Sequence, residues 1–89
     1  MGIKQLLSVL KNKKMVKIYT TQTCPYCIMA KDYFKKLGVE YQEADVSIDE
    51  KAREELIAKS HQMGVPVIDI NGTIIVGFNR PEIDKALGQ

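Results

Sequence analysis

The sequence has no long apolar run, only two cysteines and a single histidine, and these shortages narrow the class of protein. No stretch approaches the roughly 18 to 20 apolar residues that cross a bilayer, so we expect no membrane-spanning segment. The first residues contain no continuous apolar segment followed by a small-residue cleavage site, so we expect no cleaved signal peptide. With 89 residues, 45% of them hydrophobic and 27% charged, the chain is predicted to be one soluble cytoplasmic domain spanning residues 1–89.

Net positive charge is confined to the N-terminal segment. Residues 1–17 contain five lysines and no acidic residue, whereas the remaining residues comprise eight basic and eleven acidic ones, a net charge of −3. A nucleic-acid-binding surface needs basic residues interleaved with aromatic ones on one face, and no such pattern occurs. We therefore expect neither nucleic acid nor a membrane among the partners.

The two cysteines form a Cys24-Pro25-Tyr26-Cys27 motif. A disulfide that closes so short a loop removes little entropy from the unfolded chain, which argues against a purely stabilising bridge. A structural zinc site requires four ligands, and His61 is the only additional candidate nitrogen, so we expect no metal site within one chain. The remaining interpretation is a redox pair of the C-x-x-C type, which requires a neighbouring βαβ pattern.

The hydrophobic pattern supplies that context. Apolar residues at helical spacing predict an amphipathic N-terminal helix at residues 2–12, followed by a basic turn that ends at residue 14. Ser47 and Glu50 have the form of a capping box that opens a later helix, and Asn71-Gly72 is a strong hairpin signal. The expected elements after the basic turn are a strand at 15–20, a helix at 25–37, a strand at 39–46, a helix from Ser47 to about Ser60, strands at 65–70 and 73–76, and a helix at 80–87.

The element order α, β, α, β, α, β, β, α predicts an α/β fold. The first βαβ unit must be parallel and right-handed, and the hairpin adds two antiparallel strands. We therefore expect a four-stranded mixed sheet flanked by helices on both faces.

The position of the cysteine pair predicts different roles for the two sulfur atoms. Pro25 suits the first position of a helix, which places Cys24 at the N-cap, next to unpaired N–H groups and the positive end of the helix dipole. Such sites lower a thiol pKa from about 8.5 to roughly 3.5–7.5, so Cys24 is expected to be a nucleophilic thiolate. Cys27 begins the apolar stripe of the same helix and is expected to be shielded, protonated and within reach of Cys24. Cys24 would then attack a disulfide and Cys27 would resolve the mixed disulfide.

Two further positions have more than one interpretation. Val65-Pro66 is either a proline at the start of an ordinary edge strand or a cis peptide bond that points the Val65 backbone at a ligand. His61 is expected to end the preceding helix, because histidine tolerates a left-handed backbone better than most residues.

These features together resemble the glutaredoxins of the thioredoxin-fold superfamily. Cys24-Pro25-Tyr26-Cys27 matches their dithiol motif residue for residue, Gln62 to Pro66 resembles the segment ending in Thr-Val-Pro with a cis proline, and the element order matches throughout. The resemblance implies a thioredoxin-like monomer in which Cys24 is the nucleophile and Cys27 the resolving thiol. It also implies no permanently bound cofactor, with glutathione as co-substrate and disulfide-containing proteins as partners. The substrate-binding residues implied by the resemblance are Thr23, Tyr26, Val65, Pro66, Gly77, Phe78 and Asn79.

The chain departs from the glutaredoxin pattern at several places, among them Gly64 where threonine is usual and His61 where glycine is frequent. Thr21 is neutral where glutaredoxins often carry a basic residue, and the stretch Gly77-Phe78-Asn79-Arg80-Pro81 is closer to the Gly-Phe-Arg-Pro of NrdH-type redoxins. Phe78 then either fills space against the last helix or contacts substrate. Arg80 either supplies the missing cation for a glutathione carboxylate or is simply solvated.

The leading functional hypothesis is a glutathione-dependent thiol–disulfide oxidoreductase that reduces protein or glutathione mixed disulfides. The alternative within the same class is an NrdH-like redoxin that is reduced by a thioredoxin reductase and serves ribonucleotide reductase. Two hypotheses of other classes are a dimer that holds an iron–sulfur cluster through Cys24 of both chains, and a non-catalytic interaction module.

Overall fold

The computed structural model describes residues 15–88, so the predicted helix at residues 2–12 and the basic turn lie outside the described residues. The strands form one sheet in the order β2-β1-β3-β4, with β1 parallel to β2 and β3 antiparallel to both β1 and β4. The predicted mixed sheet and its parallel βαβ unit are therefore confirmed. The elements are, in chain order, β1 (Val16–Thr20), α2 (Pro25–Leu37), β2 (Gln42–Asp45), α3 (Glu50–Ser60), β3 (Val67–Ile70), β4 (Thr73–Val76) and α4 (Arg80–Leu87).

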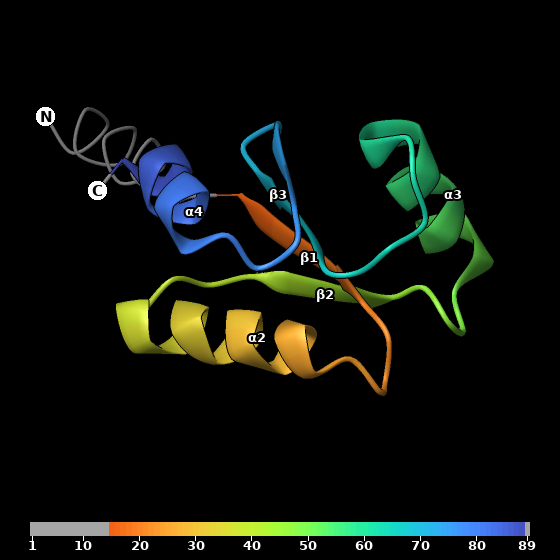
Figure 1. The fold of residues 1–89 in the computed structure, drawn as a ribbon, viewed down its shortest axis with the longest axis horizontal. Helices are drawn as coiled ribbons and strands as arrows, with labels where there is room; N and C mark the ends of the chain where they lie inside the picture. Colours follow the sequence, from red (N-terminus) through yellow and green to blue (C-terminus); the bar gives the residue numbers. More distant parts are fainter. Residues whose placement is uncertain (1–14, 89) are drawn as a thin grey trace, which may run out of the picture.

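The sheet separates two hydrophobic cores, because successive side chains of a strand point to opposite faces. Ile18 of β1 faces the core formed with Phe34 of α2 and Ile83 of α4, whereas Tyr19 faces the core formed with Leu56 of α3. Figure 1 shows α2 and α3 on opposite sides of the sheet. None of the helices within the described residues is both long and apolar enough to cross a membrane.

A charged network covers the α3 side of the sheet, around the fully buried Tyr19. Its hydroxyl donates to Glu55 at 2.8 Å and accepts from Lys59 at 2.8 Å. Lys59 also forms an ion pair with Asp69 at 2.8 Å, and Lys17 with Glu55 at 2.9 Å. The hydrogen bond to Asp69 is the main cause of the raised pKa of Lys59. This network ties α3 to β1 and β3 and satisfies the buried hydroxyl group.

The helices α2 and α4 begin and end where the sequence predicts, because local signals fix their ends. Cys24 caps α2 at its start, and Gly38 ends it with a left-handed backbone at φ 71°. Asn79 caps α4, where its side-chain oxygen accepts from the Glu82 N–H at 3.3 Å.

The predicted start of α3 is wrong. Ser47 does not cap this helix: its N–H donates to the Asp45 carboxylate at 2.9 Å, and its hydroxyl contacts the same oxygen atom, which closes a turn after β2. The cap is Asp49, whose carboxylate accepts from the Ala52 N–H at 3.1 Å. Because Ser47 is hydrogen-bonded to Asp45, it does not cap the helix, and Asp49 takes the N-cap position instead.

Three strands are shorter than predicted: the first begins at Val16 instead of Met15, and the second also ends one residue early, at Asp45. The second strand begins at Gln42 instead of Val39, because the Val39 N–H donates to the Phe34 carbonyl at 3.0 Å and so belongs to the end of α2. The third begins at Val67 instead of Val65, and Pro66, which has no N–H for the ladder, precedes the strand.

His61 ends α3 as predicted, with a left-handed backbone at φ 59° and its N–H bonded to the Ile57 carbonyl at 2.8 Å. The substitution His61→Gly should raise the free energy of unfolding by about 0.5–1 kcal/mol, because glycine adopts this backbone without a Cβ penalty. Urea denaturation of both proteins measures the change. His61→Val at the same site should be destabilised, since a β-branched residue disfavours positive φ. A glycine variant less stable than the valine variant would contradict the assignment.

Candidate active site

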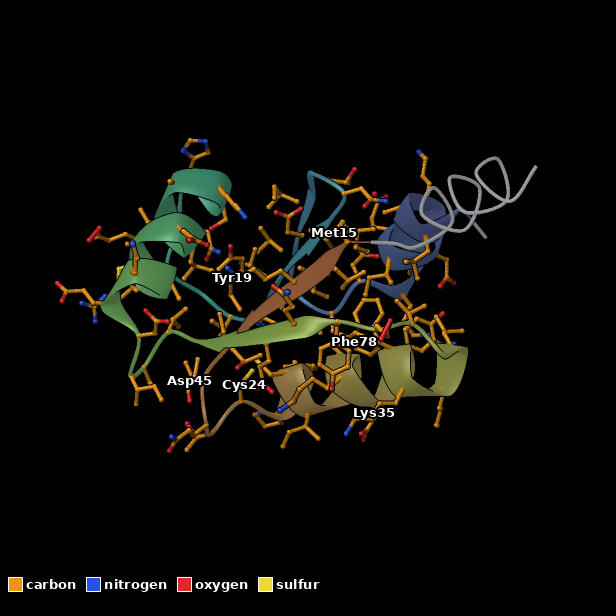
Figure 2. The ribbon with its side chains drawn as sticks, turned by 180° about the vertical axis from the view of Figure 1, so that it is seen from behind. Met15, Tyr19, Cys24, Lys35, Asp45 and Phe78 are labelled. Atoms are coloured by element: carbon orange, nitrogen blue, oxygen red, sulfur yellow. The ribbon has the colours of Figure 1, made fainter. Side chains whose placement is uncertain are left out.

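The Cys24 sulfur lies at the start of α2, where the loop from β1 meets the helix (Figure 2). Cys24 has an extended backbone, with φ −101° and ψ 107°, and Pro25 follows in the first turn of the helix. The sulfur accepts a hydrogen bond from the Cys27 N–H at 3.1 Å, which is one of the N–H groups that a helix start leaves unpaired. The predicted N-cap position is confirmed, and the sulfur lies at the positive end of the helix dipole.

Cys27 occupies a different environment on the same helix. It is 1% exposed and faces inward, whereas Cys24 is 8% exposed. Burial, followed by the hydrogen bond with the Cys24 side chain, raises the pKa of the Cys27 thiol to about 12. The prediction that Cys27 is the more shielded member of the pair is confirmed, and its raised pKa supports the prediction that it is protonated.

The Val65-Pro66 segment lies against the first cysteine. Its peptide bond is cis, as one of the two interpretations required, and a contact of the Val65 backbone with a ligand remains a prediction. The Cys24 thiol donates to the Val65 carbonyl at 3.9 Å, and the Gly77 N–H donates to the Pro66 carbonyl at 2.8 Å. The fold therefore brings Cys24, Val65, Pro66 and Gly77 together from three separate parts of the chain.

The other residues expected to bind substrate divide into two groups. Thr23 and Tyr26 are exposed beside Cys24, with the Tyr26 side chain 61% exposed. Phe78 instead packs edge-on against Tyr33, with ring centroids 5.9 Å apart, next to α2 (Figure 2). The Asn79 side chain caps α4. Phe78 and Asn79 thus have structural roles, and a contact of either with substrate remains a prediction.

A cluster of three polar side chains near the cysteine pair was not predicted from the sequence. Lys31, one helical turn after Cys27, forms an ion pair with Glu43 of β2 at 2.9 Å, and the buried Thr20 hydroxyl donates to the same carboxylate oxygen at 2.8 Å. The hydrogen bond from Lys31 lowers the pKa of Glu43. The positive charge of Lys31 also opposes, in a small way, the rise in the pKa of Cys27. No local sequence pattern predicts this cluster, because its three residues belong to β1, α2 and β2.

A C-x-x-C pair at a helix start, facing a cis proline across the end of a four-stranded mixed sheet, defines a thioredoxin-fold thiol–disulfide redox protein. The glutaredoxin family model matches residues 16–75, and the chain belongs to the glutaredoxin family. It is therefore a glutaredoxin-family thiol–disulfide oxidoreductase.

Individual relatives agree with this assignment. The chain is 51% identical over 73 residues to an uncharacterized glutaredoxin-like 8.6 kDa protein in the rubredoxin operon of Clostridium pasteurianum, covering 82% of this chain and 97% of that protein. It is 42% identical over 62 residues to glutaredoxin 3 of Escherichia coli K12, covering 70% and 75%. The crystal structure of the glutaredoxin from Methanosarcina mazei Go1 superposes with a TM-score of 0.77 at 31% identity, covering 84% and 79%.

Proposed function

We propose that the protein reduces glutathione mixed disulfides and protein disulfides through a Cys24–Cys27 dithiol/disulfide cycle, with glutathione as the reductant. The observation that carries this proposal is the inequality of the two sulfur atoms. The Cys24 sulfur caps the start of α2 and accepts the Cys27 N–H at 3.1 Å, whereas Cys27 is more deeply buried and its pKa is raised to about 12. Cys24 is therefore proposed as the nucleophile that attacks the substrate, and Cys27 as the thiol that resolves the mixed disulfide.

The cycle balances in three steps. The Cys24 thiolate attacks one sulfur of the substrate disulfide, so that a bond to Cys24 forms, the substrate S–S bond breaks, and the leaving thiolate takes up a proton. Cys27 then loses its proton and attacks the Cys24 sulfur, which releases the second substrate thiol and leaves a Cys24–Cys27 disulfide. Two electrons have passed to the substrate. Two glutathione molecules return the pair to the dithiol and leave as glutathione disulfide.

The surroundings of Cys24 suit a peptide-like substrate. The Val65 carbonyl lies 3.9 Å from the sulfur, in backbone that precedes β3, so it can accept a hydrogen bond from the main chain of a bound peptide. Thr23 and the exposed Tyr26 flank the same sulfur. Gly77 is held to the same segment, because its N–H donates to the Pro66 carbonyl at 2.8 Å.

A second candidate is an NrdH-like redoxin that takes electrons from a thioredoxin reductase. The stretch Gly77 to Pro81 favours it, because it reads Gly-Phe-Asn-Arg-Pro where glutaredoxins often have Gly-Gly followed by small polar residues and Asp. The neutral Thr21 favours it as well, since no cation stands at that position for a glutathione carboxylate.

One pair of assays separates the two candidates. Glutathione, glutathione reductase and NADPH should sustain reduction of a glutathionylated peptide by this protein, whereas thioredoxin reductase and NADPH without glutathione should not. NADPH consumption measures both rates. Turnover with thioredoxin reductase alone would identify the NrdH-like activity, and absence of turnover in both assays would refute the proposed reaction.

A further inference from the structure

Arg80, the first residue of α4, is held in an unusual position for an exposed cation. Its guanidinium lies over the Tyr33 ring, with the central carbon 4.7 Å from the ring centroid. No carboxylate among residues 15–88 forms an ion pair with it. Because a stacked guanidinium is already oriented, it loses little freedom when it binds an anion.

The acidic residue one helical turn after Arg80 does not form an ion pair with it. Asp84 stands four residues after Arg80, a spacing at which oppositely charged side chains on a helix can pair. Its carboxylate instead accepts a hydrogen bond from the Tyr33 hydroxyl. Tyr33 therefore supports the guanidinium with its ring and occupies Asp84 with its hydroxyl, which leaves the charge of Arg80 without a partner in this part of the chain.

A stripe of side chains leads along α2 from the active-site cysteine to this cation. Tyr26, Met29 and Tyr33 follow a spacing of three and four residues, so they share one face of the helix. Tyr26 is 61% exposed and Met29 is 48% exposed, although both are large and apolar. Exposed aromatic and sulfur-containing side chains of this kind suit contact with a bound polypeptide.

We propose that Arg80 binds a carboxylate of polypeptide disulfide substrates, an acidic side chain three or four residues from the cysteine that Cys24 attacks. Tyr33 lies nine residues after Cys24, about 13 Å along the helix axis, and its side chain leans back toward the helix start. An extended peptide advances about 3.3–3.6 Å per residue, so three or four residues span roughly 10–14 Å. This inference rests on the proposed attack by Cys24 and adds a preference for acidic substrates.

The test uses short alanine-rich peptides that contain one cysteine activated as a thiopyridyl disulfide. The Cys24 thiolate attacks the peptide sulfur, which forms a peptide–Cys24 disulfide and releases pyridine-2-thione, whose absorbance gives the rate. One glutamate is placed two to six residues from the cysteine on either side, with glutamine in the matched peptides. We expect glutamate at three or four residues, on one side, to raise the second-order rate constant about three- to tenfold over glutamine, and high salt to remove the advantage.

Two variants assign this preference to the guanidinium. Arg80→Gln should react with the acidic peptide as slowly as with its glutamine counterpart, whereas Lys85→Gln, which removes an exposed cation from the same helix, should keep the preference. Arg80→Lys should keep only part of it, because lysine lacks the planar fork. An equal rate at every glutamate position, or a preference that survives in Arg80→Gln, would overturn the inference. Failure of the wild-type protein to react with any peptide would instead refute the attack by Cys24.

Discussion

The variant Cys24→Ser should lose disulfide reduction by at least about a thousandfold, because it removes the sulfur that attacks the substrate. Its fold should survive, since serine is a favoured N-cap residue and its hydroxyl can accept the hydrogen bond that the Cys27 N–H now gives to sulfur at 3.1 Å. The glutathione-coupled assay measures the activity, and urea denaturation measures the stability.

The matched control for this prediction is the same substitution at the second cysteine. A Cys24→Ser protein that still reduces disulfides, beside a Cys27→Ser protein that does not, would reverse the assigned roles. Loss of both activity and folding in Cys24→Ser would show that the sulfur is needed for structure as well as for attack.

The variant Cys27→Ser should stop reduction of protein disulfides after the first step. The substrate then stays bound to Cys24, because the sulfur that releases it is missing. A substrate attached through glutathione can still be released by a second glutathione molecule, so reduction of glutathione mixed disulfides should persist. Intact-mass spectrometry should show one equivalent of protein substrate attached at Cys24, and absence of such an adduct would contradict the resolving role.

The raised pKa of Cys27 gives the resolving step a pH dependence of known sign. At pH 7 the thiol is protonated, because its pKa in the resting dithiol is about 12. Only the deprotonated form attacks, and its fraction grows with each pH unit while the pH remains below the pKa. Release of substrate from a preformed mixed disulfide should therefore accelerate between pH 6 and pH 9 in the wild-type protein and should not occur at any of these pH values in Cys27→Ser.

The sequence predicted the elements whose ends depend on neighbouring residues. Pro25 and Gly38 bound α2, and Asn71-Gly72 sets the hairpin, because proline, glycine and tight turns act locally. The start of α3 was mispredicted because two side chains, Ser47 and Asp49, are both able to cap it, and a third residue decides between them.

The candidate site was predictable in its chemistry but not in its surroundings. The cysteine pair follows from its spacing and from Pro25, whereas the cis bond at Val65-Pro66 remained open, because either isomer before proline costs little. The Tyr33–Asp84 hydrogen bond joins residues 51 positions apart. Contacts of this kind depend on how the helices pack against the sheet, and no local sequence pattern predicts that packing.

The placement of α3 behind the sheet has a practical consequence. Its solvent-facing residues, such as the exposed Lys51, belong to the layer opposite the one that carries the cysteines. A fluorophore, a resin linker or a fusion partner joined there would lie on the face of the sheet opposite α2. The fold thus offers an attachment point for immobilising or tagging this oxidoreductase on the layer that does not carry the cysteines.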